Sequence, residues 1–487
     1  MSIKQMCPLN SEARNATQMN KTNLALAGVL LGLASFSAGC KGHLLKSERD
    51  ARQNLQSIGR FYRPEGQRPP LPTLGPNSSL ADVLNYALLN QPRIETAYYD
   101  WAASVERITT ARSLPDPQIT FQMDIENVVS SIMPGLMMNF PGPGKLGARA
   151  EVASAESQGQ YWAFESAILE TAFEVKSAWY RLHYLQEKVR VNERNLKVLM
   201  GLEELARAQN EVGKVSLLDV LRAQSEQDRL RTELASLKDS QIVLQTRFKA
   251  ALGLTAANPD PPLPQKVEST TLDLTAEKLF ETALAENRGL KAIEAEVRAA
   301  NAAILLAGKA RRPDSSLGLM ADVKMNPVLY RPTATISLPV WRDKFAAEIA
   351  EAEANKRAAE ARLSTEQITL VTGFAEKTYL YREATRAQQL LERELLPKAR
   401  RVLELARSGY LSGQIDFFNL SDTERTVLGM ELDLVEAKTQ RETTLAELSL
   451  ILRGMSPSTA VMSQGTREIT RTQPAGKSVS SGMQGMR

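Results

Sequence analysis

The sequence of 487 residues has only two cysteines and two histidines. Two cysteines exclude a disulfide framework, and so few imidazole and thiolate ligands argue against a zinc site. Aromatic residues make up 6% of the chain, which favours long helices rich in alanine and leucine over an aromatic β-sandwich. The 60 basic and 56 acidic side chains nearly cancel, and no basic patch with interleaved aromatic residues indicates a nucleic-acid partner.

The sequence also lacks the patterns that are typical of enzymes. No nucleophile–base pair, phosphate-binding glycine loop or cluster of metal ligands is present, so we expect no catalysis, no cofactor and no resident metal. His183 is interpreted as a structural residue of a long helix. Methionines in strand-like segments are interpreted as packing residues, and binding of Cu(I) or Ag(I) by their thioethers is the minor alternative. These methionines are Met123, Met133, Met137, Met138, Met320 and Met325.

Long apolar runs are absent as well. The longest, residues 24–36, is too short to span a bilayer as a mature helix. Lys21 precedes this run and small residues follow it, a pattern typical of a secretory signal. Residues 37–40 (SAGC) resemble a bacterial lipobox, although Ser37 stands where leucine is usual. We therefore expect a lipoprotein signal over residues 1–39.

Cys40 is the expected lipid anchor, and simple cleavage beside an unmodified cysteine is the alternative. Lys41 follows it in place of the aspartate that retains lipoproteins in the inner membrane, so the expected destination is the outer membrane. Translation could start at Met1 or at Met19. Residues 40–78 are polar and then rich in proline, which predicts an extended, lipidated tether along a surface.

One stretch, residues 206–221, organises the rest of the chain and returns as residues 406–420. In each copy a long helical pattern reaches a glycine, Gly213 or Gly413, and a second long helix follows. Glycine accepts the positive φ that a tight turn after a helix requires. Each copy is therefore predicted to be the tip of a helical hairpin.

The helices that lead to these tips are unusually long. From Lys145 to Gly213 no stop signal occurs, and about 65 residues at 1.5 Å each extend about 100 Å. Heptad spacing within this segment predicts a coiled coil. The heptad positions are Leu182, Leu185, Val189, Asn192, Leu196 and Leu199.

Ser79 and Asp82 form a capping-box pattern that predicts a helix continuing to about Arg112. The hydrophobic period then changes from that of a helix to that of a strand. Residues 119–125 alternate apolar and polar, and residues 132–140 place their large apolar side chains on one parity. Two such strands form a hairpin of the length that a tilted transmembrane strand needs, and a buried hairpin is the alternative.

The whole pattern occurs twice, with an offset of 196 to 200 residues, so the chain is predicted to be a tandem duplication. We expect repeats over residues 79–257 and 274–455, joined by a proline-rich linker at 258–273. Residues 456–487 are expected to be a disordered tail. Corresponding residues include Ile119, Phe121, Gly213 and Leu234, which return as Leu317, Leu319, Gly413 and Leu434.

Four strands cannot close a barrel, and an open sheet edge cannot face lipid. If the strands enter a membrane, several chains must share one barrel, and three chains would supply twelve strands. The predicted fold is therefore mainly α-helical with a small membrane β part. Three chains would form a shared 12-stranded outer-membrane barrel continued by a periplasmic tunnel of helices.

Over about residues 76–455 the sequence resembles the TolC-like outer-membrane efflux factors, which are trimeric exit channels of tripartite pumps. The duplicated glycine tips carry this resemblance. Segment 140–146 (FPGPGKL), Tyr410 and residues 413–417 (GQIDF) are most similar to the heavy-metal branch, which serves cobalt–zinc–cadmium or copper–silver pumps. Segment 338–342 (LPVWR) departs from the first motif. The resemblance implies a homotrimer in outer-membrane lipid, with a periplasmic adaptor and an inner-membrane pump of the RND type.

The resemblance also assigns roles to residues at the tips. It implies that the tips contact the adaptor, although the glycines alone could simply turn the chain. Polar residues after each glycine would line the periplasmic aperture, where a carboxylate ring favours cations, although polar residues are also common early in a helix. The docking residues are Val212, Gly213, Lys214, Leu411, Ser412 and Gly413, and the aperture residues are Asp219, Asn419 and Asp422.

Three rival functions stay open from the sequence. Two of them keep the channel: multidrug efflux and the exit duct of a type I protein-secretion system. The third is a periplasmic coiled-coil adaptor or scaffold lipoprotein. The duplicated plan of strands and long hairpins argues against the third, because adaptors carry a single helical hairpin.

Overall fold

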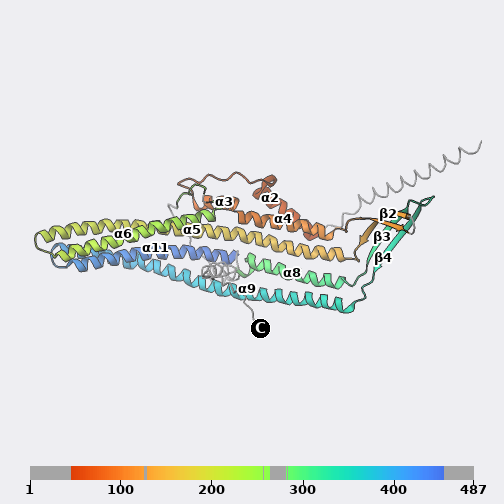
Figure 1. The fold of residues 1–487 in the computed structure, drawn as a ribbon. Coiled ribbons are helices and arrows are strands. Elements are labelled where there is room, and N and C mark those ends of the chain that lie inside the picture. The colour runs from red at the N-terminus through yellow and green to blue at the C-terminus, as the bar shows by residue number, and fades with distance from the viewer. Residues whose placement is uncertain (1–44, 126–128, 256, 264–280, 282, 454–487) are drawn as a thin grey trace, which may run out of the picture.

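The computed structural model describes residues 45–125, 129–255, 257–263, 281 and 283–453. The expected signal segment 1–39, Cys40, most of the expected linker and the expected tail 456–487 lie outside the described residues. Within the described part of the chain, long helices form an elongated bundle with a small sheet at one end (Figure 1). The expected fold class, mainly α-helical with a small β part, is confirmed.

The helices of the first repeat are followed by those of the second. They are α2 (Lys46–Tyr62), the short η1 (Pro64–Gly66), α3 (Leu80–Asn90), α4 (Pro92–Arg112), α5 (Lys145–Glu211) and α6 (Leu217–Ala251), then α8 (Arg288–Lys309), α9 (Arg342–Leu390), the π turn η2 (Leu391–Leu395), α10 (Leu396–Leu411) and α11 (Phe417–Arg453).

Four antiparallel strands form the sheet, in the order β1 (Gln118–Ile125), β2 (Val129–Phe140), β3 (Asp314–Asp322), β4 (Leu329–Ser337). Both predicted hairpins are confirmed, and pairing of β2 with β3 joins the two repeats. The face of the sheet that carries the apolar side chains is uncovered: Ile119, Phe121 and Ile336 are each more than 60% exposed. In the described part of the chain, β1 and β4 each pair on one side only.

The predicted long helix is confirmed. Helix α5 has 67 residues, which corresponds to about 100 Å. Of the predicted heptad positions, Leu182, Leu185 and Leu199 are buried. Asn192 is also fully buried, and its Nδ2 donates to the carbonyl of Lys188 at 2.9 Å. The heptad pattern therefore identified the side of α5 that faces the other helices.

The predicted helix over residues 79–112 is two helices. The capping box of Ser79 and Asp82 starts α3 as expected, but α3 ends at Asn90 and Pro92 begins α4. Pro92 has no N–H to donate to α3 and forces an extended backbone on Gln91, which has φ −70° and ψ 118°. The break lets the amides of Asn90 and Gln91 donate to the last carbonyls of α6.

The expected extended tether is wrong for residues 46–62, which form helix α2. Its Leu55, Ile58 and Tyr62 have helical spacing and pack on the cluster that contains Trp101 and Phe164. The prolines that suggested an extended chain all follow residue 63. The polar composition hid this helix, because only a narrow stripe of α2 is apolar.

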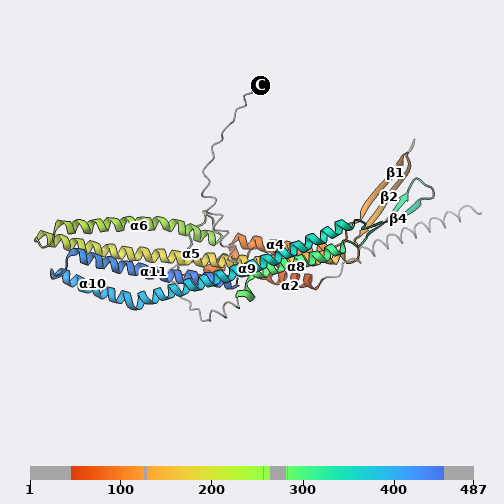
Figure 2. The same cartoon turned by 90° about the horizontal axis from the view of Figure 1, so that it is seen from below.

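The second long helix differs from α5 because a π turn, Leu391–Leu395, separates α9 from α10. The offset between the repeats rises from 198 at the strands to 200 at the tips, so the second copy has two additional residues in this interval. A π turn holds an additional residue within an otherwise α-helical segment. We attribute the π turn to one of these two residues, and Figure 2 shows the chain bending there.

Candidate docking site at the paired hairpin tips

Both helix–helix turns lie at the end of the molecule opposite to the sheet (Figures 1 and 2). Helices α5 and α6 meet at the first turn, and α10 and α11 meet at the second. The two tips pack on each other through one apolar cluster. Its buried residues come from all four helices: Leu199, Leu202, Ala206, Val220, Ala223, Leu230, Leu403, Ala406, Tyr410, Phe417, Leu420 and Val427.

The first tip turns at Gly213, whose φ is 72°. The N–H of Gly213 donates to the carbonyl of Asn210 at 2.9 Å, and the N–H of Lys214 donates to that of Gln209 at 2.8 Å. The side chain of Asn210 donates to the carbonyl of Val215 at 2.7 Å. These bonds satisfy groups that the ends of the helices leave open, so the turn is rigidly held.

The second tip repeats this geometry at Gly413, whose φ is 77°. The N–H of Gly413 donates to the carbonyl of Tyr410 at 3.1 Å, and the N–H of Gln414 donates to that of Gly409 at 2.8 Å. The two predicted turns are therefore confirmed as equivalent left-handed turns. Both glycines are exposed at the end of the bundle.

Asp219 lies in a capping box at the start of α6. Its Oδ2 accepts from the N–H of Ser216 at 3.3 Å and from the Ser216 hydroxyl at 3.1 Å. In the second copy the carboxylate has moved to Asp416, whose Oδ1 accepts from the N–H of Asn419 at 2.8 Å. Each tip thus keeps one carboxylate at a helix N-terminus, where the helix dipole stabilises negative charge.

A cavity of about 730 Å³ lies between the two tips, and another of about 770 Å³ lies farther along the bundle. The structure brings six of the predicted site residues together in the wall of the cavity between the tips: Lys214, Leu411, Ser412 and Gly413 from the docking set, with Asp219 and Asn419 from the aperture set. Val212, Gly213 and Asp422 are exposed outside this wall.

The sequence did not show that Tyr410 lines this cavity close to Asp219. Tyr410 is 3% exposed and packs edge-on against Phe417 at 6.0 Å between ring centroids. Burial raises the pKa of the Tyr410 hydroxyl, and the negative charge of Asp219 raises it further. The hydroxyl is buried and has no hydrogen-bond partner among the residues that the structure describes. Asp219 and Tyr410 come from different repeats, so no local pattern could have shown this proximity.

Polar side chains also link the two helices of each hairpin. Glu203 of α5 accepts from Gln224 at 2.8 Å, Arg207 at 2.7 Å and Gln227 at 2.9 Å, and these bonds lower the pKa of Glu203 to about 2. In the second repeat Glu424 stands where the first has Gln224 and accepts from Arg407 at 3.1 Å. Burial raises the pKa of Glu424, although Arg407 opposes that change.

The outer surface of the tips is apolar. Val212, Leu217 and Leu218 of the first tip, with Leu411 and Phe418 of the second, are each more than half exposed. The guanidinium of Arg222 lies over the ring of Phe418, 5.9 Å from its centroid. Exposed apolar groups gathered at one end of a molecule are typical of a protein contact surface.

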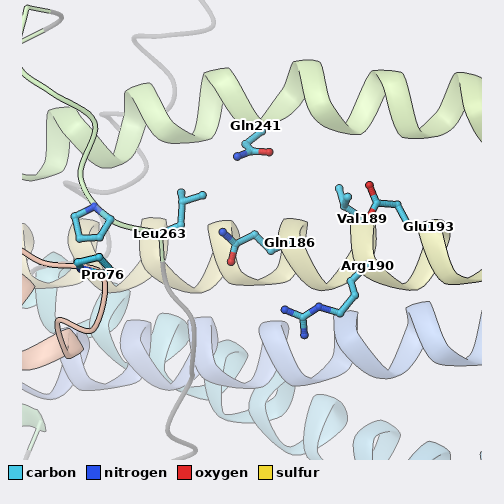
Figure 3. Close-up of a pocket in the computed structure, with 8 residues that line it drawn as sticks. Pro76, Gln186, Val189, Arg190, Glu193, Gln241 and Leu263 are labelled. Atoms are coloured by element: carbon cyan, nitrogen blue, oxygen red, sulfur yellow. The ribbon is translucent and has the colours of Figure 1, made fainter.

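The larger cavity lies farther along the first hairpin (Figure 3). Gln186, Val189, Arg190 and Glu193 of α5 form one wall, and Gln241 of α6 forms the other. Pro76 and Leu263 close it from two connecting segments that cross the helices there. Figure 3 shows Leu263 beside Gln186, with Gln241 across from them.

Two further observations bear on function. No helix in the described part of the chain is both long and apolar enough to cross a bilayer. The described residues contain no group of three or more histidine, cysteine or carboxylate side chains placed to share a metal ion. His183 lies on α5, as expected from the sequence.

A small sheet with an uncovered apolar face, joined to duplicated long hairpins, defines a channel-type transport fold. A family model described as outer membrane efflux protein matches residues 83–254 and again residues 279–453. These matches cover more than half of the chain, which therefore belongs to the outer membrane efflux protein family and functions as an outer-membrane efflux channel. The double match confirms the tandem duplication.

Solved channel structures share the fold at low sequence identity. The outer membrane protein VceC from Vibrio cholerae is 17% identical with a TM-score of 0.65, over 77% of this chain and 96% of that one. The open-state MtrE outer membrane channel of Neisseria gonorrhoeae is 17% identical with a TM-score of 0.66, over 80% and 97%. CusC is 15% identical with a TM-score of 0.64, over 80% and 98%. No curated protein sequence matches the chain significantly.

Proposed function

We propose that three copies of this chain form the outer-membrane exit channel of a tripartite efflux system that exports heavy-metal cations. The observation that carries this proposal is the separation of two surfaces at opposite ends of the bundle. A sheet with an uncovered apolar face lies at one end, and among the described residues its strands β1 and β4 pair on one side only; paired tips with exposed apolar residues lie at the other end. The first suits lipid and neighbouring copies, and the second suits a protein partner.

At the tips, the partner would be a periplasmic adaptor that links the channel to an inner-membrane RND-type pump. Val212, Lys214 and Leu411 are exposed beside the two glycine turns, where another backbone can approach closely. The cavity between the tips offers the adaptor a recess lined by both repeats. Energy for export would come from the pump.

Asp219, Asn419 and Asp422 would face the aperture of the trimer. Threefold symmetry turns each carboxylate into a ring, and such rings favour cations. Asp219 would take this role while it caps α6: its Oδ2 accepts from the Ser216 hydroxyl at 3.1 Å, and its Oδ1 lies 3.8 Å from the guanidinium of Arg222. Asn419 would contribute an uncharged ring.

The proposed substrate class rests on segment 140–146 and on the residues around Tyr410, which are similar to the heavy-metal branch. A susceptibility panel on a strain that lacks this gene, and on the complemented strain, tests it. Copper, silver, zinc, cobalt and cadmium salts are compared with dyes, bile salts and antibiotics. We expect sensitivity confined to one metal group and restored by complementation. Sensitivity to dyes and antibiotics alone would overturn the heavy-metal assignment and indicate multidrug efflux.

The proposed anchor is lipid on Cys40. Metabolic labelling with a fatty acid should mark the wild-type protein and leave Cys40→Ser unlabelled. Insertion of the trimer should survive this substitution, because the sheet itself contacts lipid. Unchanged labelling of Cys40→Ser would place the anchor elsewhere.

A further inference from the structure

The strand register separates the methionines of the sheet onto its two faces. Residues that pair directly across antiparallel strands share a face. Gln118 pairs with Met137 and Gln122 with Met133, and Gly135 pairs with Met320. Three methionines, Met133, Met137 and Met320, therefore share the polar face. Met123 and Met138 occupy the opposite face with the apolar side chains.

These three methionines gather around one glycine. A Cβ atom added to Gly135 would lie 2.6 Å from Cγ of Met320 and 2.7 Å from Oγ1 of Thr120. The side chain of Met320 therefore occupies the space that a larger residue at position 135 would fill. Met133 and Met137 stand two residues on either side of Gly135 along β2. Met320 is thus the diagonal neighbour of both, and such neighbours lie about 7–8 Å apart, within reach of long side chains.

The chemistry of the surrounding face makes this cluster unusual. The face is otherwise lined by hydroxyl, amide and charged groups, as the cross-strand pairs Ser316 with Thr335 and Gly318 with Thr333 illustrate. Methionine is expected where apolar surface must be filled, yet the large apolar groups of this sheet lie on its other face. Met133 is only 1% exposed, although the sheet has no second layer among the described elements.

We propose that Met133, Met137 and Met320 form a binding site for a soft monovalent cation, Cu(I) or Ag(I), on the inner wall of the shared barrel. This inference rests on the proposed function, which makes the polar face of the sheet the wall of the exit path. Neutral thioether sulfur selects soft monovalent ions, whereas Zn(II) is bound mainly by thiolate, imidazole and carboxylate ligands, none of which belongs to this cluster. Neutral thioethers also suit a conduit, because an ion that must leave cannot be held too tightly.

A matched pair of variants tests the site by Ag(I) binding to the purified full-length protein. One variant carries Met133→Leu, Met137→Leu and Met320→Leu, and the control carries Met123→Leu and Met138→Leu on the other face of the same sheet. All proteins carry Cys7→Ser and Cys40→Ser, so that thiols do not compete. Equilibrium dialysis with silver nitrate should show binding by the parent and the control, weakened at least tenfold in the triple variant and unaffected by excess Zn(II).

Three results would overturn the site: no binding by the parent, equal binding by all proteins, or equal loss in both variants. Leucine nearly conserves the volume of methionine, so the sheet should still form, and the heat-modifiable migration of a folded barrel verifies this. If the triple variant does not fold, Met320→Leu alone is compared with Met138→Leu, and only the former should weaken Ag(I) binding. Dialysis measures binding without a pump. A failure of the proposed methionine site would therefore appear in the dialysis, whereas a failure of the proposed heavy-metal export would appear in the susceptibility panel.

Discussion

At the scale of single residues, the tips depend on backbone conformations that few side chains accept. Gly213 and Gly413 have φ values of 72° and 77°, and a Cβ at either position would meet no neighbouring atom. Glycine is therefore required at these two positions for its backbone conformation and not because neighbouring atoms crowd them. The sequence predicted both turns because the demand is local and glycine meets it.

Gly213→Pro and Gly413→Pro should each abolish efflux while the trimer still assembles. Proline fixes φ near −65° and removes the N–H that donates to Asn210 or Tyr410. The disturbance is confined to the end of the bundle opposite to the sheet. Resistance assays measure export, and heat-modifiable migration measures assembly. Gly413→Asn is the control, because asparagine tolerates the left-handed region. Normal resistance in both proline variants would contradict adaptor docking at the tips.

Glu203 should make the stability of the first hairpin depend on acid pH. Its folded pKa of about 2 lies below the ordinary value of 4.5, so its stabilising contribution is fully present above about pH 4.5 and is lost as pH falls toward 2. Thermal unfolding followed by circular dichroism between pH 5 and pH 2.5 should show a steeper decline for wild type than for Glu203→Gln. Glu204→Gln, an exposed neighbour, should behave as wild type. Identical pH profiles for wild type and Glu203→Gln would contradict this role.

No sequence pattern pointed to Glu203 or to the proximity of Asp219 and Tyr410. Gln224 and Gln227, two of the three partners of Glu203, lie on α6, and Asp219 and Tyr410 lie on different hairpins, so these contacts depend on how the helices pack. The position of Asp219 after a glycine did indicate a special residue. The structure adds that its local task is to cap α6.

At the scale of elements, helix α2 is held by one buried carboxylate. Glu48 has no exposed surface and accepts from Arg112 at 2.7 Å, from Thr109 at 2.9 Å and from Arg52 at 3.2 Å. Burial alone would raise the pKa of Glu48, but the hydrogen bonds from Arg112, Thr109 and Arg52 outweigh it and keep the pKa below its usual value. The charged form therefore persists at neutral pH and fastens α2 to α4.

Glu48→Gln should release α2 from the bundle. Removing the charge leaves Arg112 with a weaker partner in a mostly buried site, at a cost on the order of 3 kcal/mol. Amide hydrogen exchange over residues 46–62 should quicken strongly, while exchange in α5 stays unchanged. Glu106→Gln is the matched control, since Glu106 also pairs with Arg52 but is 65% exposed, so its loss should cost less than about 1 kcal/mol. Equal exchange in both variants would show that α2 is held by its apolar stripe alone.

The π turn shows the limit of prediction at this scale. The change of offset between the repeats was visible in the sequence, but either a longer helix or a local bulge could absorb two additional residues. Helix α9 reaches the π turn at Leu391 and resumes as α10 with Pro397 in its first turn, where proline needs no N–H. Lys438 of α11 bridges to Glu392 within the π turn at 2.9 Å and so holds the bend against the neighbouring helix.

At the scale of the whole molecule, periodicity and duplication were enough to predict the architecture. The alternation of apolar and polar residues identified the strands, and heptad spacing identified the side of α5 that faces the other helices. The nearly constant separation between corresponding residues identified the two repeats. The arrangement of the sheet required the structure. Only the register shows that Met133, Met137 and Met320 share the polar face, because β2 and β3 belong to different repeats.

The free edges β1 and β4 should pair between copies to close the barrel. Edge strands cannot stay unpaired in lipid, so β1 of one chain must meet β4 of the next. Gln122→Cys on β1, combined in turn with Cys at Arg331, Thr333 or Thr335 on β4, places both thiols on the polar face. In a Cys7→Ser, Cys40→Ser background, oxidation should give at least one pair whose covalent ladder ends at three chains.

Gln122→Cys with Ala334→Cys is the control for this ladder, because Ala334 faces the other side of β4. Its thiols are separated by the sheet and should not join. Three chains of four strands make twelve, so a ladder that ends at the trimer supports closure by the outer edges of β1 and β4, which have no partner strand among the described residues. A ladder that ends at the dimer would contradict threefold closure, and monomer alone from all three pairs would contradict pairing of β1 with β4. Closure would also decide the chemistry of the path, since it would turn the polar face with its methionines inward and the apolar face toward lipid.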